Sequence, residues 1–405
     1  MTWRRRAGGA EESVPDIEHV DVPRMRNERL QRTRDSLRSH GLAAALLCDP
    51  LNVRYAALPA VCDVFSMHVT SRWLLVPVES DPVLWEYADA MHVTEHEWAG
   101  DLHPARGWTF FGSGSRSAAD ATRFAAEITA ELRERGILGE PLGLDRLEAV
   151  GYLALTEAGV KVVDAQSAME QARAIKTYDE LTVIRRNARS CDDSIAALLG
   201  AMQPGVTEDY LWGTLVGTSL KAGALWCETR LLSSGPRTNP WMQEASARVV
   251  HEGELVAFDT DLVGEDGYLT DVSRTYLCGD KPPTDEQRRL YQASYAFLHT
   301  ALPQFRAGAS FEELGRRIAR QLPEEFQQQR YPFVAHGTGM VDEYPCVNFV
   351  DHHEGQLEVG MVMSVESYVG AVGGAQGVKL EEQVVITADG PEPISTAPYD
   401  QRLLG

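Results

Sequence analysis

The chain has 405 residues, of which 44% are hydrophobic and 24% charged, and its 38 basic and 59 acidic side chains give a formal net charge of −21. This composition is typical of a soluble globular protein and excludes a collagen, a mainly disordered chain and a small disulfide-linked scaffold. The length favours two or three domains, because one hydrophobic core rarely grows past about 250–300 residues. The acidic balance is the opposite of that of a phosphate-backbone binder, so we expect no nucleic-acid partner.

The cysteine pattern and the N-terminus bear on location. The six cysteines contain no C-x-x-C pair and are too sparse for a disulfide framework, which favours reduced thiols and a cytoplasmic protein. Three arginines at positions 4–6 are followed by glycine and acidic residues, not by the apolar stretch of a signal peptide. No apolar run approaches the roughly 20 residues of a membrane span, so we expect no membrane partner.

The first part of the chain alternates predicted helices and strands. Residues 1–21 are polar and glycine-rich, which predicts a flexible tail. Amphipathic helices are predicted near 25–37 and over 117–135. Apolar runs bounded by turn residues predict strands over 43–48, 73–78, 82–87 and 142–145. This alternation indicates an α/β domain over residues 22–174.

A second domain is predicted over residues 175–405. It opens with a long helix over 178–202, which Pro204 and Gly205 end. Two further helices are expected over 284–306 and 310–322. Strands are expected over 249–251, 254–259, 268–277, 361–368 and 383–387. The fold class is therefore α/β (α+β), with helices and strands mixed in both domains.

Two aspartates follow a hydrophobic strand of the second domain. Asp259 and Asp261 are two positions apart, so on a strand they point to the same face. Gly264 and Gly267 allow a hairpin that returns Asp271 beside Asp261. Because converging carboxylates repel one another, a buried pair needs protons, cations or a metal ion between them.

A histidine and two glutamates complete this pattern. His336 lies in a His-Gly-Thr-Gly segment that leaves room around its imidazole. Glu381 lies just before one apolar strand, and Glu366 lies within another. An acid there is costly unless it is paired or bound to metal. Each residue alone is explained equally well as a loop histidine or a structural ion pair. Together the set is oxygen-rich, which suits two divalent ions such as Fe, Mn, Co or Zn, whereas a structural zinc site would hold more cysteine.

The ordered set Asp261, Asp271, His336, Glu366 and Glu381 resembles the metal ligands of the M24 metallopeptidase family, which includes methionine aminopeptidase, prolidase, aminopeptidase P and creatinase. Residues 174–181 resemble the start of that family's catalytic domain. The resemblance, which extends from about residue 22, implies a creatinase-like N-terminal α/β domain. A pita-bread catalytic domain would follow, with a curved antiparallel sheet, flanking helix pairs and two divalent transition-metal ions.

One branch of the family is more similar than the rest, and it comprises lyases of dimethylsulfoniopropionate (DMSP). The similar segments are residues 49–55, 228–241, 258–264 and 342–345. This resemblance implies a homodimer that cleaves a small carboxylate, DMSP, to dimethyl sulfide and acrylate.

The same resemblance assigns roles to individual residues. It implies that Asp342, six residues after His336, is the catalytic base, and that Tyr331 assists the substrate. It also implies that Asp259 is a further ligand or lies directly behind the ligands. A cationic sulfonium favours aromatic faces, and the candidate substrate-binding side chains are Trp241, Tyr268 and Tyr344. The structural alternatives are a surface ion pair for Asp342 and plain packing for Tyr331 and Trp241.

Three functions stay open on the sequence alone. The first is a metal-dependent carbon–sulfur lyase acting by β-elimination, which requires a base and a metal-bound carboxylate. The second is a metallohydrolase of a small amide, such as a Xaa-Pro dipeptide or an ectoine-like cyclic amidine. The third is a metal-free binding protein on the same fold. The complete ligand set argues against the third. Peptidases of the family place histidines at or beside Trp241 and at Asp342, and losing such acid–base groups costs about 10²–10⁴-fold, which argues against the second.

Overall fold

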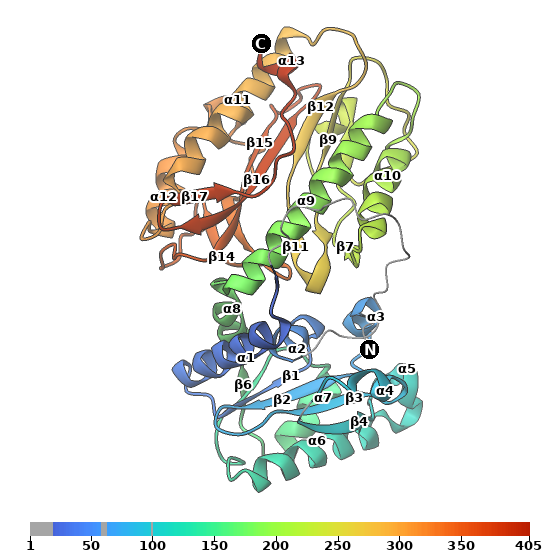
Figure 1. Ribbon diagram of the computed structural model, residues 1–405, viewed down its shortest axis with the longest axis vertical. Helices are drawn as coiled ribbons and strands as arrows, with labels where there is room; N and C mark the ends of the chain where they lie inside the picture. Colours follow the sequence, from blue (N-terminus) through green and yellow to red (C-terminus); the bar gives the residue numbers. More distant parts are fainter. Residues whose placement is uncertain (1–18, 58–62, 99) are drawn as a thin grey trace.

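The computed structural model describes residues 19–57, 63–98 and 100–405. The predicted tail over 1–21 therefore lies almost entirely outside the described residues. Figure 1 shows a smaller domain built from the first part of the chain and, above it, a larger domain built from the rest; α8 lies at the junction, and α9 starts there and runs along the larger domain. No helix of the described residues is long and apolar enough to cross a membrane.

A mixed six-stranded sheet forms the centre of the first domain, in the order β4-β3-β2-β1-β5-β6. The strands are β1 (Ala44–Leu47), β2 (Trp73–Pro77), β3 (Val83–Tyr87), β4 (Asp101–Ala105), β5 (Leu142–Leu144) and β6 (Val162–Asp164). The longer helices are α1 (Val22–Ser39), α6 (Ser117–Glu134), α7 (Ala149–Glu157) and α8 (Gln166–Ala174). The shorter helices are α2 (Pro50–Ala56), α3 (Asp63–His68), α4 (Met91–Thr94) and α5 (Phe110–Ser113).

Helices cover both faces of this sheet, which explains why its strands are apolar without interruption. In β1, Ala45 and Leu47 pack with residues of α1 and α8. Ala44 and Leu46 point to the other face and pack with residues of α6 and α7. The result is the three-layered α/β domain that the alternating pattern predicts.

The second domain contains the remaining elements. Its helices are α9 (Tyr178–Ala201), α10 (Glu208–Lys221), α11 (Asp285–Ala301), α12 (Phe311–Ala319) and α13 (Gln401–Leu404). Its short strands are β7 (Trp226–Cys227), β8 (Leu232–Ser234), β9 (Leu255–Phe258), β10 (Leu262–Val263), β11 (Leu269–Thr270) and β12 (Arg274–Leu277). Its later strands are β13 (Phe333–Thr338), β14 (Asp342–Asn348), β15 (Val362–Val369), β16 (Val378–Thr387) and β17 (Gly390–Pro393).

The strands of this domain form three antiparallel sheets, in the orders β14-β13-β15-β16-β17, β12-β9-β8 and β11-β10-β7. Residues of α11 and α12 pack on the five-stranded sheet, and residues of α9 and α10 pack on the sheet of β8, β9 and β12. Figure 1 shows the two helix pairs on the outside of the strands. Side chains that point away from both helix pairs share the space between the sheets, where the polar residues gather.

Several predicted elements differ in detail. The strand expected over 383–387 begins five residues earlier, at Val378, so it includes Glu381, and the helix expected over 310–322 ends at Ala319. The strand expected over 268–277 is split into β11 and β12, because residues 271–273 leave the ladder. The segment 249–251 makes only a single bridge, between Val249 and Thr207. The helix expected over 284–306 ends at Ala301 and continues as a 3-10 turn over Leu302–Gln304. Pro303 lies in that turn and has no N–H to continue an α-helix.

Buried polar contacts join the two domains. Arg173 of α8 donates its Nε–H to Oε2 of Glu343 in β14 at 2.8 Å, and both side chains are buried. The Nε atom of Arg29 in α1 lies 3.6 Å from Oε1 of Glu180 in α9, and both side chains are buried. Thr177 and Glu180 also form a capping box that starts α9, which stabilises the first turn by satisfying two backbone donors. The start of the second domain is therefore held against α1.

An aromatic cluster allows a test of the core of the first domain. The Phe124 ring lies 3.9 Å from that of Trp108 and 5.3 Å from that of Trp73. We predict that Phe124→Ala lowers the unfolding free energy of this domain by about 3–5 kcal/mol, because it opens a cavity in a packed core. Urea unfolding followed by tryptophan fluorescence measures the effect. Phe111→Ala, at a side chain that is 82% exposed, is the control and should change stability by less than about 0.5 kcal/mol. Equal losses in the two variants would contradict the assigned core.

Candidate active site

A hairpin brings three aspartates of the second domain together. Asp259 and Asp261 follow β9, and Asp271 follows β11. Leu262 of β10 pairs with Thr270 of β11, so the next residue outward on each strand, Asp261 and Asp271, meet at the same end. The hairpin turn contains Gly267 at φ +80°, a conformation that glycine adopts without strain. The hairpin predicted from the glycines is thus present, and all three carboxylates are buried.

The five-stranded sheet supplies the other candidate ligands. Glu366 of β15 lies directly opposite Glu381 of β16, and His336 lies on the neighbouring strand β13. The preceding residues, Ala335, Val365 and Leu380, face the helices. Alternation along the strands therefore turns the imidazole and the two glutamates to the other face. His336 Nε2 lies 3.3 Å from Asp271 Oδ2 and 3.4 Å from Glu366 Oε1.

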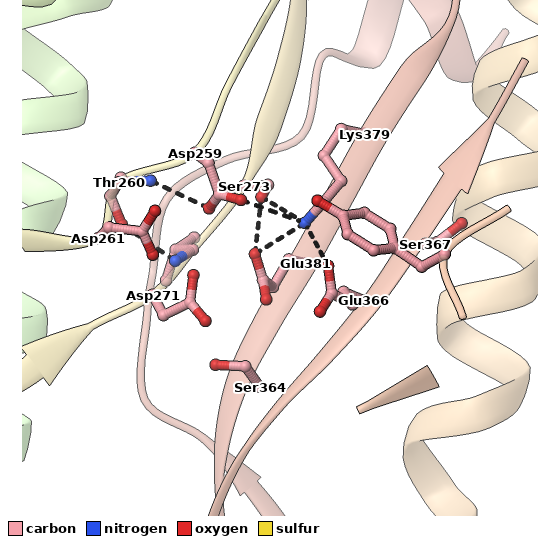
Figure 2. Close-up of polar contacts among 12 residues, drawn as sticks. Asp259, Thr260, Asp261, Asp271, Ser273, Ser364, Glu366, Ser367, Lys379 and Glu381 are labelled. Atoms are coloured by element: carbon pink, nitrogen blue, oxygen red, sulfur yellow. Dashed lines mark hydrogen bonds and ion pairs between the residues drawn. The ribbon is translucent and has the colours of Figure 1, made fainter. Parts of the chain in front are cut away.

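A buried lysine lies in the middle of these carboxylates (Figure 2). Lys379 Nζ lies 2.8 Å from Glu366 Oε2, 3.0 Å from Glu381 Oε2 and 3.5 Å from Asp259 Oδ2, and its side chain is 0% exposed. The ammonium also donates to Ser273 Oγ at 2.7 Å, and that hydroxyl donates to Glu381 at 2.6 Å. Lys379 is not among the site residues predicted from the sequence. The available signal is its position two residues before Glu381, which places both side chains on one face of β16.

The charges of this cluster are unbalanced. Five buried carboxylates, those of Asp259, Asp261, Asp271, Glu366 and Glu381, surround one ammonium among the described residues. Burial raises the pKa of Asp261 and of Asp271 well above the usual range, and neighbouring carboxylates raise both further. Burial likewise raises the pKa of Glu381, although Lys379 opposes it. With all five acids ionised, the site would hold more negative charge than its own cations neutralise, which adds to burial in raising the pKa values of Asp261, Asp271 and Glu381.

The neighbouring carboxylates raise the pKa values of Lys379 and His336. Burial alone would lower the pKa of Lys379, but Asp259, Glu366 and Glu381 raise it well above its usual value. Burial also opposes protonation of His336, yet its contacts with Asp271 and Glu366 raise the pKa of the imidazole. For Asp259 and Glu366, burial acts to raise the pKa, but the attraction of Lys379 and hydrogen bonds lower it overall. Asp259 and Glu366, two of the three acids that contact the ammonium, thus stay ionised most easily.

The donor set fits divalent metal ions. Ligand atoms of Asp271, His336 and Glu381 lie within 4.8 Å of one another, and so do those of Asp259, Asp261 and Asp271. Asp271 belongs to both groups, so one carboxylate faces both positions. Oxygen ligands with one imidazole suit hard or borderline dications, and added positive charge would relieve the repulsion among the carboxylates.

Asp342 lies at the rim of the cluster. It is the first residue of β14 and pairs with Thr338 of β13. Its Oδ1 atom is 3.6 Å from His336 Nδ1, and its side chain is 58% exposed. Partial burial raises the pKa of Asp342, and the charges of Asp259 and Glu366 raise it further, while His336 acts in the opposite direction. Asp342 is therefore a solvent-accessible carboxylate of increased basicity next to the buried set.

Tyr331 and Trp241 form an aromatic pair beside Lys379. Trp241 Nε1 donates to the Tyr331 hydroxyl at 2.6 Å, and the Tyr331 ring centroid lies 5.2 Å from Lys379 Nζ. The indole also stacks on Tyr368 at 6.3 Å. Burial raises the pKa of the Tyr331 phenol, so it stays protonated near neutral pH. Both residues border the cluster of carboxylates, and they are hydrogen-bonded to each other.

The other two aromatic candidates do not face the site. Tyr268 is 1% exposed, its hydroxyl donates to Glu180, and Arg29 covers its ring at 5.3 Å. Its predicted role as a substrate contact is therefore wrong, because the side chain is buried at the domain junction and both its hydroxyl and its ring already have partners there. Tyr344 packs edge-to-face on Phe311 of α12 at 6.0 Å. It lies on the helix-covered side of the sheet, opposite to the carboxylates, so its predicted role is also corrected.

Comparisons with known proteins agree with this arrangement. Residues 182–388 match Metallopeptidase family M24, and residues 29–175 match the creatinase/prolidase N-terminal domain. The chain belongs to family M24. This confirms the predicted family and fold class. Among solved structures, the M24 fold of this chain resembles the Xaa-Pro dipeptidase from Bacillus anthracis, with a TM-score of 0.77 and 22% identity over 93% of this chain and 99% of that one. It also resembles aminopeptidase P from E. coli, with a TM-score of 0.70 and 17% identity over 94% and 98% of the two chains.

Two curated relatives are more similar in sequence. The dimethylsulfoniopropionate lyase DddP of Roseovarius nubinhibens is 34% identical over 95% of this chain and 89% of its own. The DddP of Roseobacter denitrificans is 32% identical over 98% of this chain and 91% of its own. This M24 enzyme is thus related over nearly its whole length to DMSP lyases, and its likeness to the peptidases of known structure is one of fold.

Metal binding by this M24 enzyme can be tested through thermal stability. We predict that Mn²⁺ or Zn²⁺ added to protein stripped with a chelator raises Tm by about 5–10 °C, since a ligand at 100 times its Kd stabilises the folded state by about 2.7 kcal/mol. Asp271→Asn should lose most of this rise, because Asp271 belongs to both ligand groups. Asp209→Asn, at an exposed acid paired with Arg230, should keep it. A full rise in the Asp271 variant would contradict the assigned metal centre.

Proposed function

We propose that this chain is a metal-dependent lyase that cleaves DMSP, or a closely related small carboxylate with an onium leaving group, by β-elimination. The products from DMSP are dimethyl sulfide and acrylate. The observation that carries the proposal is the 34% and 32% identity, over 95% or more of this chain, to two DMSP lyases. The accessible carboxylate of Asp342 beside a buried polyacidic site provides independent chemical support.

The proposed cofactor is a pair of divalent transition-metal ions, Fe, Zn, Mn or Co. The residues that would hold them are Asp259, Asp261, Asp271, His336, Glu366 and Glu381. Bound divalent ions supply Lewis-acid charge that fixes a substrate carboxylate and stabilises the negative charge that develops on it. Lys379 keeps Glu366 and Glu381 in place on their strands through its two short contacts.

Asp342 is the proposed base. The proton on the carbon next to the substrate carboxylate is weakly acidic, so a carboxylate of raised pKa is better suited to remove it than an ordinary aspartate. The C–H bond breaks as Asp342 takes the proton, and its electron pair forms the carbon–carbon double bond. The C–S bond breaks at the same time, and the sulfur leaves with the bonding pair as neutral dimethyl sulfide. No water molecule enters the reaction.

Tyr331 and Trp241 are proposed to line the space for the leaving group. Aromatic faces attract cations by about 0.5–2 kcal/mol, depending on exposure. Trp241 donates to the Tyr331 hydroxyl, which fixes the phenol next to the carboxylates. Tyr331 is thus placed to assist the substrate, and Trp241 lines the pocket and holds Tyr331. We also propose that the enzyme acts as a homodimer on a free small molecule.

Amide hydrolysis is the alternative, and the fold neighbours favour it. They are dipeptidases and an aminopeptidase, at 17–22% identity. In this chain Trp241 and Asp342 occupy positions at which such peptidases are expected to carry histidines. An acidic side chain at the rim suits proton abstraction better than binding of a scissile amide. A metal-free binding protein is the third candidate, but it would bury five carboxylates around one ammonium with no metal ion to offset their repulsion.

The test is release of dimethyl sulfide from DMSP by metal-loaded enzyme, measured by headspace gas chromatography. We predict release by the wild type and a decrease of about 10²–10⁴-fold in kcat for Asp342→Asn, with metal content unchanged. Asp351→Asn, at an exposed loop acid, is the matched control and should keep the wild-type rate.

Two results would contradict the proposal. A wild-type enzyme that binds metal and releases no dimethyl sulfide would exclude DMSP, and Xaa-Pro dipeptides and other onium carboxylates would then be assayed. Full activity in Asp342→Asn would show that another group removes the proton.

A further inference from the structure

The strand that carries Asp342 is interrupted next to it. His336 of β13 pairs with Cys346 of β14, but the following residue, Gly337, pairs with Glu343. Tyr344 and Pro345 therefore have no partner in this ladder. A Cβ atom on Gly337 would lie 2.5 Å from Tyr344 O and 2.7 Å from Glu343 O, so the backbones approach too closely for any other residue. Such bulges commonly lie next to active sites and redirect a side chain.

The Asp342 carboxylate is not held by bonds of its own. Among the described residues its one polar contact is the 3.6 Å approach to His336 Nδ1, which is beyond hydrogen-bond distance. The direction of this carboxylate is therefore set by the backbone of residues 342–344. Because the bulge separates these residues from the rest of β14, the ladder alone fixes that backbone only weakly.

The next residue, Glu343, anchors this backbone to the first domain. Its Oε2 accepts from Arg173 Nε of α8 at 2.8 Å, and its Oε1 lies 2.8 Å from Lys176 Nζ at the domain junction. The three side chains are 0%, 3% and 1% exposed. Glu170 of α8 adds a third contact, because its Oε2 accepts the Tyr344 backbone N–H at 2.9 Å. We call the contacts of Glu343 with Arg173 and Lys176 the Glu343 clamp.

A buried cluster of this kind contributes little net stability compared with apolar packing, because desolvation offsets most of the attraction. It does impose a defined geometry, since two cations must meet the two oxygens of one carboxylate. Glu343 contacts Arg173 and Lys176, whereas Asp342 lies beside His336, so the two neighbouring side chains point in different directions, one to the first domain and one to the site. The clamp is thus placed to set the direction of Asp342.

We propose that Glu343 is a positioning residue for proton abstraction, and that the first domain takes part in catalysis through the Glu343 clamp. This inference rests on the proposed function, in which Asp342 is the base. The first domain holds the backbone of residues 342–344 so that the Asp342 carboxylate faces the carbon that loses its proton. A shift of about 1 Å in such a group can cost about 10²-fold in rate.

The test compares two buried glutamates of the domain junction. Glu343→Gln weakens the clamp. Glu180→Gln is the matched control, because Glu180 pairs with Arg29 at the same junction, is equally buried and makes no contact with β14. Steady-state release of dimethyl sulfide from DMSP, with and without deuterium on the carbon next to the carboxylate, gives kcat, KM and the isotope effect for metal-loaded enzymes. Lys176→Met provides a second, milder change of the clamp if Glu343→Gln folds poorly.

For Glu343→Gln we expect kcat to fall by about 10- to 100-fold with KM nearly unchanged, since only the transition state needs the aligned base. The isotope effect should rise, because C–H cleavage becomes slower than the other steps, and amide exchange over residues 340–346 should accelerate. Glu180→Gln should change neither kcat nor the isotope effect. Equal behaviour of the two variants would overturn the clamp while leaving the lyase intact, whereas no dimethyl sulfide from the wild type would refute the proposed function itself.

Discussion

Mutual repulsion of buried carboxylates is the constraint around which the second domain is built. Burying even one ionised acid is costly unless charge or hydrogen bonds compensate it, and five acids here share one space between two sheets. Lys379 compensates part of this charge from within, and Ser273 connects its ammonium to Glu381. The remaining excess favours divalent cations. Binding of a ligand of high positive charge would relieve the remaining repulsion among the carboxylates.

The rigidity of the surrounding strands makes this concentration of charge possible. Glu366 and Glu381 cannot move apart, because the long antiparallel pair of β15 and β16 fixes their register. Apolar side chains at the alternating positions of both strands pack against α11 and α12. A register shift by one residue would turn these apolar side chains away from the helices. The same hydrophobic pattern that stabilises the fold therefore also sets the distances between charged groups.

Much of the site could be predicted from the sequence because it depends on local rules. The glycine hairpin brought Asp271 to Asp261 as expected. Glu366 was marked as unusual by its place within an apolar strand, and Glu381 by its place just before another. Lys379 was missed because a lysine at the start of a strand is more often a solvated charge. Tyr344 was misplaced because the bulge after His336 breaks the alternation along β14, and such a bulge is set by tertiary contacts. Tyr268 was misplaced because its partners, Arg29 and Glu180, come from helices far away in the sequence.

In the proposed reaction a positioned carboxylate, and not an activated water, starts the cleavage of the substrate. The most direct measurement is mass spectrometry of the products formed when metal-loaded enzyme reacts with DMSP in ¹⁸O-labelled water. We predict acrylate and dimethyl sulfide, with no heavy oxygen added to carbon. Formation of 3-hydroxypropionate carrying heavy oxygen on the carbon that bore sulfur would contradict this account, because it would mean that the site delivers water as a hydrolase does.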